Sequence, residues 1–147
     1  MQIDPRLAEI DNALYRISAK AIIAKDNKVL LVREKDDDWW SFPGGGIDYG
    51  ETIHDALVRE VSEELGVAPE HVQVDDTVAF ISIGAVVEGV PKANLFYRVT
   101  VPSHEVKSTD DVLEQKWHSL EELPKLYISP STGNVIEELH KIIGAGT

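Results

Sequence analysis

Residues 45–67 read GGIDYGETIHDALVREVSEELGV, and this stretch contains the clearest helix signal of the chain. Thr52 is a residue type favoured at the N-cap, and Asp55 follows three residues later, where a capping box has its acid, although Glu or Gln is usual there. Gly66 is a typical residue just past a helix end, because glycine adopts the left-handed conformation without a Cβ penalty. The pattern predicts a helix over about Thr52 to Leu65.

Three glutamates of this helix, Glu60, Glu63 and Glu64, stand at positions i, i+3 and i+4 and share one side of it. The side expected to be buried carries Leu57, Val61 and Leu65. Glu64 is expected at the margin of that buried side, Glu60 at its edge and Glu63 just beyond. Carboxylates this close repel one another, and partial burial raises the free-energy cost further. A compensating cation is therefore expected.

Arg59 could pair with one of these carboxylates but cannot neutralise three. Mg²⁺ could, since it is held by a few carboxylates together with waters and substrate phosphates. The preceding Pro43–Gly46 segment is predicted to be a loop whose carbonyls or N–H groups approach a ligand closely. Each feature alone has an ordinary explanation: the glutamates as a solvated helix face, the glycines as a turn. Their occurrence at fixed spacing in one segment favours a metal and phosphate site.

The whole chain has 147 residues, of which 43% are hydrophobic and 27% charged, which predicts a single domain spanning 1–147. A formal net charge of −12 argues against a sequence-blind nucleic-acid binder and against an electrostatic membrane-surface binder. The chain has no cysteine, which excludes thiolate metal sites and cysteine nucleophiles. Neither a long apolar run nor a signal-peptide pattern is visible, so a cytoplasmic protein without a membrane segment is expected.

Outside the central helix, hydrophobic patterning predicts further strands and helices. Asp26 and Asn27 form a turn signal inside a hairpin, and Asp4 and Pro5 a helix start. Strands are expected at about 17–24, 29–32, 39–42, 72–87, 93–101 and 113–118, and helices at about 5–14 and 133–143. The order of strands, helix, strands and helix predicts an α/β protein with a mixed sheet between helices.

The central stretch resembles the Nudix box completely. Gly45 is followed by five residues, Glu51, seven residues and then Arg59-Glu60-Val61-Ser62-Glu63-Glu64-Leu65-Gly66-Val67, so all seven identity positions are present and both apolar positions are Val. The preceding Trp40-Ser41-Phe42-Pro43-Gly44 resembles the usual lead-in. Looser similarity to the family extends from about residue 17 to the C-terminus. The chain is therefore identified as a member of the Nudix hydrolase family.

This resemblance implies an α/β/α sandwich and a pyrophosphohydrolase that uses Mg²⁺ or Mn²⁺. The substrate class implied is a small nucleotide: a nucleoside triphosphate, a nucleotide sugar or an ADP-ribose type compound. Carried over by position, the metal ligands are Glu60, Glu63, Glu64 and the carbonyl group of Gly44. The resemblance makes Arg59 the residue that orients a glutamate by ion pairing. It gives Gly45 and Gly66 supporting roles around the loop and helix, and Glu51 either such a role or contact with a second metal.

The chemistry expected is attack of water on one phosphorus, assisted by divalent metal and by a carboxylate that takes the proton of the water. Glu60 is the first choice for this base. An acid outside the box is the main rival, from Asp110, Asp111 or Glu114. No covalent intermediate is expected.

Five residues outside the box are candidates for substrate binding: Arg33, Trp39, Tyr97, Asp111 and Glu114. Trp39 either stacks on a base or only covers a hydrophobic patch. Arg33 either holds a phosphate or forms a surface ion pair with Glu34 or an Asp of 36–38. Tyr97 and its neighbour Phe96 face opposite ways along a strand, so one belongs to the core and the other could line a pocket.

Two other functions compete with a small-nucleotide hydrolase. One is a non-catalytic nucleotide-sensing or regulatory module of the same fold, although such modules often lose a box glutamate and this box is intact. The other is an RNA 5′-end pyrophosphohydrolase, which the acidic composition disfavours. Within the family, a Pro about sixteen residues past the box often marks preference for ADP-ribose, and this chain has Ile83 there. A homodimer is possible, and nothing in the chain decides it.

Overall fold

The computed structural model describes residues 5–7, 9–11, 14–87, 89–110, 112–132 and 134–144. Helix α1 (Ile53–Leu65) begins and ends as its caps predict. The side-chain oxygen of Thr52 accepts a hydrogen bond from the N–H of Asp55 at 3.1 Å. Gly66 adopts a φ of 65°, and its N–H donates to the carbonyl of Ser62 at 3.0 Å. The predicted central helix is therefore confirmed together with both of its end signals.

The strands form two sheets rather than one continuous sheet. They are β1 (Arg16–Ile22), β2 (Ala24–Lys25), β3 (Lys28–Glu34), β4 (Gly44–Gly46), β5 (Gln73–Val87), β6 (Val90–Thr100) and β7 (Val112–Ser119). The four-stranded sheet has the order β4-β1-β6-β5 and is mixed, because β1 and β6 run parallel while the other pairs are antiparallel. The three-stranded sheet, β2-β3-β7, is antiparallel.

The predicted turn at Asp26 and Asn27 joins β2 to β3. Both residues have positive φ, 50° and 60°, as a tight hairpin turn requires. Because β2 follows β1 after one residue but pairs with β3, the chain passes from the first sheet to the second here.

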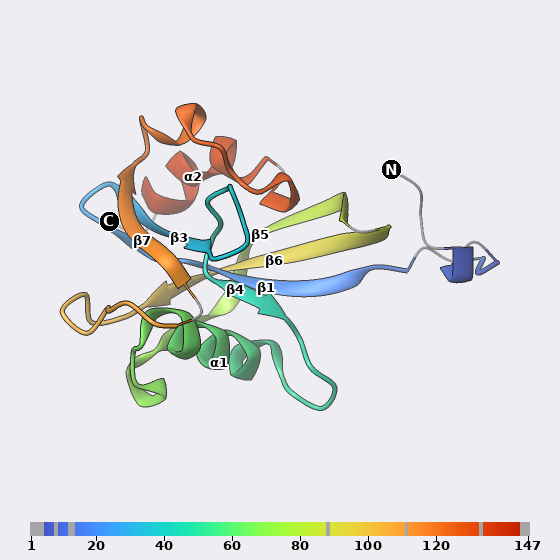
Figure 1. The fold of residues 1–147 in the computed structure, drawn as a ribbon, viewed down its shortest axis with the longest axis horizontal. Helices are drawn as coiled ribbons and strands as arrows, with labels where there is room; N and C mark the ends of the chain where they lie inside the picture. Colours follow the sequence, from blue (N-terminus) through green and yellow to red (C-terminus); the bar gives the residue numbers. More distant parts are fainter. Residues whose placement is uncertain are drawn as a thin grey trace.

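The two long helices cover opposite faces of the sheets (Figure 1). Side chains alternate along β1: Ala19 and Ala21 pack in the core beneath α1, whereas Ile22 packs in the core beneath α2 (Val135–Gly144). The α1 core also holds Leu57, Val61 and Leu65, and the α2 core also holds Val135, Leu139 and Ile142. This arrangement confirms the expected α/β/α sandwich.

Several element predictions differ in extent from the structure. Residues 39–42 make only isolated bridges, Val32 with Ser41 and Trp40 with Ile128, instead of a strand. Within the helix expected at 5–14, residues 5–7 form the short 3-10 turn η1 (Pro5–Leu7), whereas residues 8, 12 and 13 and the proposed cap, Asp4, lie outside the described residues. The remaining 3-10 turns are η2 (Pro69–His71), η3 (Leu123–Lys125) and η4 (Pro130–Thr132). Among the described residues, no helix is both long and apolar enough to cross a membrane.

Candidate active site

The glycine segment forms strand β4, which contacts the acidic helix α1. The prediction of a loop at Gly44–Gly46 is wrong, because these residues pair with β1 in antiparallel register, Gly44 opposite Lys20. Gly44 has a φ of 133°, and a Cβ there would lie 2.1 Å from the carbonyl oxygen of Ala19. Only glycine fits this close approach of two backbones. The N–H of Gly44 points to α1 and donates to both carboxylate oxygens of Glu64, at 3.3 and 3.4 Å.

Glu64 is a buried carboxylate, with 5% of its surface exposed. Burial raises the pKa of Glu64 to about 8, and the negative charges of Glu60 and Glu34 act in the same direction. The positive charge of Lys20 and the N–H of Gly44 act in the opposite direction without cancelling the effect of burial. The position therefore favours a neutral acid unless a further cation approaches it.

Arg59 holds two glutamates at once. Its Nε and Nη2 atoms donate to the two carboxylate oxygens of Glu51 at 3.1 and 2.7 Å, and its Nη1 donates to Glu60 at 2.8 Å. Nη2 also reaches the carbonyl oxygen of Gly46 at 3.3 Å. These hydrogen bonds lower the pKa of Glu51 and raise the pKa of Arg59, so both of these groups stay charged. The guanidinium group thereby fixes the direction of Glu60.

The three box glutamates have different surroundings. Glu60 lies against β4, where a Cβ added to Gly45 would be 2.6 Å from its Oε1 atom. The side chain of Glu63 is 52% exposed and lies 3.8 Å from Arg59. Within the described ranges, no three His, Asp or Glu side chains form a group that could hold a metal ion. Glu60 and Glu63 both lie near Arg59, whereas Glu64 lies against Gly44.

The chemistry of the available donors suits a hard divalent cation. The donors are the carbonyl oxygen of Gly44 and the carboxylates of Glu60, Glu63 and Glu64, and oxygen ligands of this kind are those that Mg²⁺ and Mn²⁺ prefer. The buried Glu64 carboxylate, with its raised pKa, is the group that would gain most from a nearby cation. The donor types therefore suit such an ion, and Gly44 and Glu64 are already joined by a hydrogen bond from the N–H of Gly44.

Two predicted substrate contacts pair with each other instead. Nη2 of Arg33 on β3 donates to Glu114 on β7 at 2.7 Å, since the two residues stand opposite each other in the sheet. The guanidinium group also lies 5.7 Å from the ring centre of Trp40. The prediction that Arg33 forms an ion pair is thus confirmed. The partner found is Glu114, whereas the prediction named Glu34 or an Asp of 36–38.

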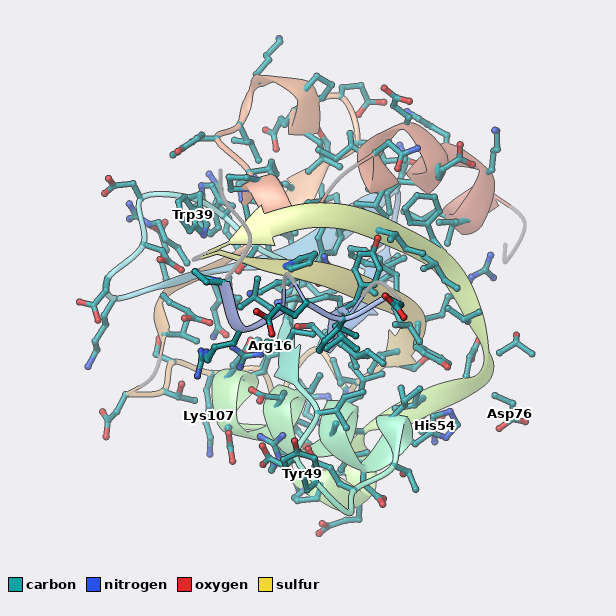
Figure 2. The ribbon with its side chains drawn as sticks, turned by 90° about the vertical axis from the view of Figure 1, so that its right-hand side faces the viewer. Arg16, Trp39, Tyr49, His54, Asp76 and Lys107 are labelled. Atoms are coloured by element: carbon teal, nitrogen blue, oxygen red, sulfur yellow. The ribbon has the colours of Figure 1, made fainter. Side chains whose placement is uncertain are left out.

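The remaining candidates lie in separate places. Tyr97 is only 8% exposed, and its ring packs edge-on against that of His54 in α1, with 5.6 Å between the ring centres. It is therefore a core residue, and the expectation that it lines a pocket is wrong. Trp39 is half-buried, and its ring lies edge-on to that of Tyr127 with 6.0 Å between the ring centres. Figure 2 shows Trp39 well away from His54 and Tyr49. Asp111 lies outside the described residues.

Sequence reasoning missed two residues that contact the site. The Nζ atom of Lys20 donates to the carbonyl oxygen of Gly44 at 3.4 Å. A lone lysine within the apolar run that became β1 was the available signal. The hydroxyl of Thr109 donates to the backbone carbonyl of Glu64 at 3.2 Å. No local pattern indicates this contact, because 45 residues separate the two groups.

An α/β/α sandwich in which a capped acidic helix packs beneath a glycine strand defines a class of fold and site that the Nudix proteins share. Residues 14–139 match the NUDIX domain, and the chain belongs to this family. Members of the family are pyrophosphohydrolases that act on small nucleotides and generally use divalent metals.

Known relatives carry several substrate names. An ADP-ribose pyrophosphatase of Methanocaldococcus jannaschii is 30% identical over 116 residues, 75% of this chain and 65% of that protein. An RNA pyrophosphohydrolase of Acinetobacter baylyi is 46% identical over 66 residues, 44% of this chain and 40% of that protein. The chain thus spans less than two thirds of the length of either relative. The crystal structure of a UDP-X diphosphatase has a TM-score of 0.77 at 18% identity, covering 92% of this chain and 66% of that one, which is a likeness of fold.

Proposed function

We propose that this chain is a divalent-metal-dependent pyrophosphohydrolase that cleaves a nucleoside diphosphate linked to a second group. The observation that carries the proposal is the buried Glu64 carboxylate, which is hydrogen-bonded to Gly44 and has a pKa raised to about 8. A buried acid next to other carboxylates costs free energy, and an oxygen-preferring cation would offset that cost. Mg²⁺ is the ion we propose, with Mn²⁺ as a substitute.

The ligands proposed for this ion are the Gly44 carbonyl and Glu60, Glu63 and Glu64. When bound, the ion supplies charge neutralisation for the pyrophosphate and makes water more acidic. Glu60 is proposed as the base that takes the proton from the attacking water, with Arg59 holding its carboxylate by the hydrogen bond at 2.8 Å. Water attacks one phosphorus, the bridging oxygen leaves with the other phosphate, and no covalent intermediate forms.

Among the substrate classes, we favour a nucleoside diphosphate sugar, with ADP-ribose as the first compound to test. The support is the extent of similarity, since the match to the ADP-ribose pyrophosphatase runs over 75% of the chain. The match to the RNA pyrophosphohydrolase is confined to 44% of the chain, and the net charge of −12 opposes a long polyanion. Ile83 replaces the proline that often accompanies ADP-ribose preference, so other nucleotide sugars belong in the same panel.

The test is a product assay with Mg²⁺ or Mn²⁺ and a panel of ADP-ribose, other nucleotide sugars, nucleoside triphosphates, dinucleoside polyphosphates and 5′-triphosphorylated RNA. Products are separated by chromatography, and ADP-ribose should give AMP and ribose 5-phosphate after addition of one water. Glu63→Gln is the control for turnover. Metal-dependent cleavage that this variant loses would support the hydrolase, and the best substrate would name its class.

Three results would overturn parts of the proposal. Preferred cleavage of triphosphorylated RNA over every small nucleotide would replace the substrate class. A folded protein that binds Mn²⁺ and a nucleotide sugar but cleaves nothing would point to the nucleotide-sensing module. Tight binding of a nucleotide sugar in excess EDTA would contradict the role given to the metal.

A further inference from the structure

Lys20 contacts the backbone of Gly44, and the proposed mechanism does not use this contact. Its partner, Gly44, is held from both sides: its N–H donates to Glu64 from the α1 side, and its carbonyl oxygen accepts from Nζ of Lys20 at 3.4 Å. The same carbonyl is the backbone ligand proposed for the divalent ion. A divalent cation bound there would compete with the lysine ammonium group for one oxygen atom.

The pairing of β1 with β4 places the ammonium group of Lys20 beside Gly44. Lys20 is paired directly with Gly44 in the β1–β4 register, and neither a side chain at Gly44 nor a wider strand spacing separates them. The lysine is half-buried and also lines a narrow cavity with Ser41, Phe42, Asn94, Phe96 and Thr132. A half-buried ammonium group needs a hydrogen-bond acceptor, which the carbonyl oxygen of Gly44 provides.

We propose that Lys20 is the resident cation at the Gly44 carbonyl, that a divalent cation displaces it from this oxygen, and that the freed ammonium group then contacts the pyrophosphate of the substrate. This inference rests on the metal site of the proposed function. A divalent ion carries more charge than an ammonium group and repels it at the distance of a shared ligand. The four-carbon stem of lysine is flexible enough to move the charge away.

The freed charge has a nearby anion to meet. A phosphate group that shared a divalent ion with the Gly44 carbonyl would lie within reach of the Lys20 side chain, because Nζ of Lys20 already contacts that carbonyl. Lys20 would thus weaken metal binding in the absence of substrate and strengthen substrate binding in the presence of metal. These two effects have opposite signs, and simple damage to the site would not produce that combination.

The first experiment measures Mn²⁺ binding without substrate, by electron paramagnetic resonance of the free ion. Lys20→Met removes the charge and keeps most of the stem, and Lys20→Arg keeps a cation. Lys25→Met is the matched control, because Lys25 is exposed and donates to Ser103 far along the chain, and its loss changes the net charge equally. Circular dichroism and thermal unfolding establish that each variant is folded. If Lys20→Met does not fold, Lys20→Gln takes its place.

We expect Lys20→Met to bind Mn²⁺ about tenfold more tightly than the wild type, an effect of the size seen when groups beside metal ligands are changed. Lys20→Arg and Lys25→Met should bind like the wild type. At saturating Mn²⁺, the KM of Lys20→Met for the best substrate should rise about tenfold, as expected for loss of a charge-assisted contact to phosphate. The KM of Lys25→Met should not change.

Unchanged or weaker Mn²⁺ binding by Lys20→Met would overturn the inference while leaving the proposed hydrolase intact. Tighter Mn²⁺ binding with an unchanged KM would overturn the transfer of the ammonium group to substrate. Wild-type protein that binds no Mn²⁺ would overturn both this inference and the metal site on which it rests.

Discussion

Arg59 and Glu51 form a two-point ion pair in which Nε and Nη2 of the arginine donate to the two carboxylate oxygens at 3.1 and 2.7 Å. Glu51 precedes the cap of α1, and Arg59 lies two turns into the helix, so the pair ties the segment before the helix to its middle. The remaining nitrogen of the guanidinium group is left for Glu60, at 2.8 Å. The pair therefore acts as a brace that orients a proposed catalytic carboxylate.

Arg59→Lys should remove this brace while keeping the charge. Lysine offers a point charge instead of a planar fork, so it cannot contact Glu51 at two points and Glu60 at a third. We expect kcat to fall about 10- to 100-fold, the range found when a residue supporting a metal ligand is replaced. Steady-state kinetics at saturating Mg²⁺ measure this change. A variant with wild-type kcat would show that charge alone is sufficient at this position.

Glu64 should make the stability of the metal-free protein fall as the pH rises. Its pKa is raised from 4.5 to about 8 in the folded protein. Between these values the folded protein keeps a proton that the unfolded chain has released, so the stabilisation is complete below pH 4.5 and is lost as the pH rises through about 8. Denaturant unfolding in EDTA at a series of pH values measures the free energy.

Glu64→Gln is the matched variant for that experiment. It should lack this component of the pH dependence, be at least as stable as the wild type near pH 8 without metal, and lose turnover by orders of magnitude. The difference between the two stability curves isolates Glu64, because every other titrating group is common to both. Parallel curves would mean that Glu64 titrates normally in the folded protein.

Glu63→Gln should separate function from stability. Its side chain is half-exposed and lies 3.8 Å from Arg59, so the free energy of unfolding should change by less than about 0.5 kcal/mol. Turnover should fall at least about 100-fold if Glu63 binds the metal. Glu137→Gln, an exposed glutamate of α2, is the control and should leave both quantities unchanged. Near-normal activity of Glu63→Gln with Mg²⁺ would remove Glu63 from the ligand set.

Gly44→Ala and Gly45→Ala should fail in different ways. A Cβ at Gly44 would meet the backbone oxygen of Ala19 at 2.1 Å, so the β1–β4 pairing must distort and the melting temperature should drop. The atoms nearest to a Cβ at Gly45 belong to the end of the Glu60 side chain, at 2.6 Å, and that side chain can turn away. We therefore expect Gly45→Ala to stay folded and lose activity. Thermal unfolding and kcat, measured on both variants, compare the two; equal losses of stability would contradict this difference.

The sequence alone determined the local features of this protein. The ends of α1 follow from Thr52 and Gly66, and the common side of the glutamates follows from their spacing, because both depend on residues within one or two helical turns. The hairpin turn at Asp26 and Asn27 and the apolar side of α2 were predictable for the same reason. The family was predictable as well, because every identity position of the motif lies in one continuous stretch of the chain.

The tertiary structure alone decided which distant groups meet. The glycine segment is a strand because β1 lies beside it, and that pairing sets the N–H of Gly44 against Glu64 and its carbonyl oxygen against Lys20. The pairing of Arg33 with Glu114 likewise depends on the register between β3 and β7, two strands far apart in the chain. Register is fixed by the packing of whole strands, and a shift of one residue would turn each of these side chains to the opposite face.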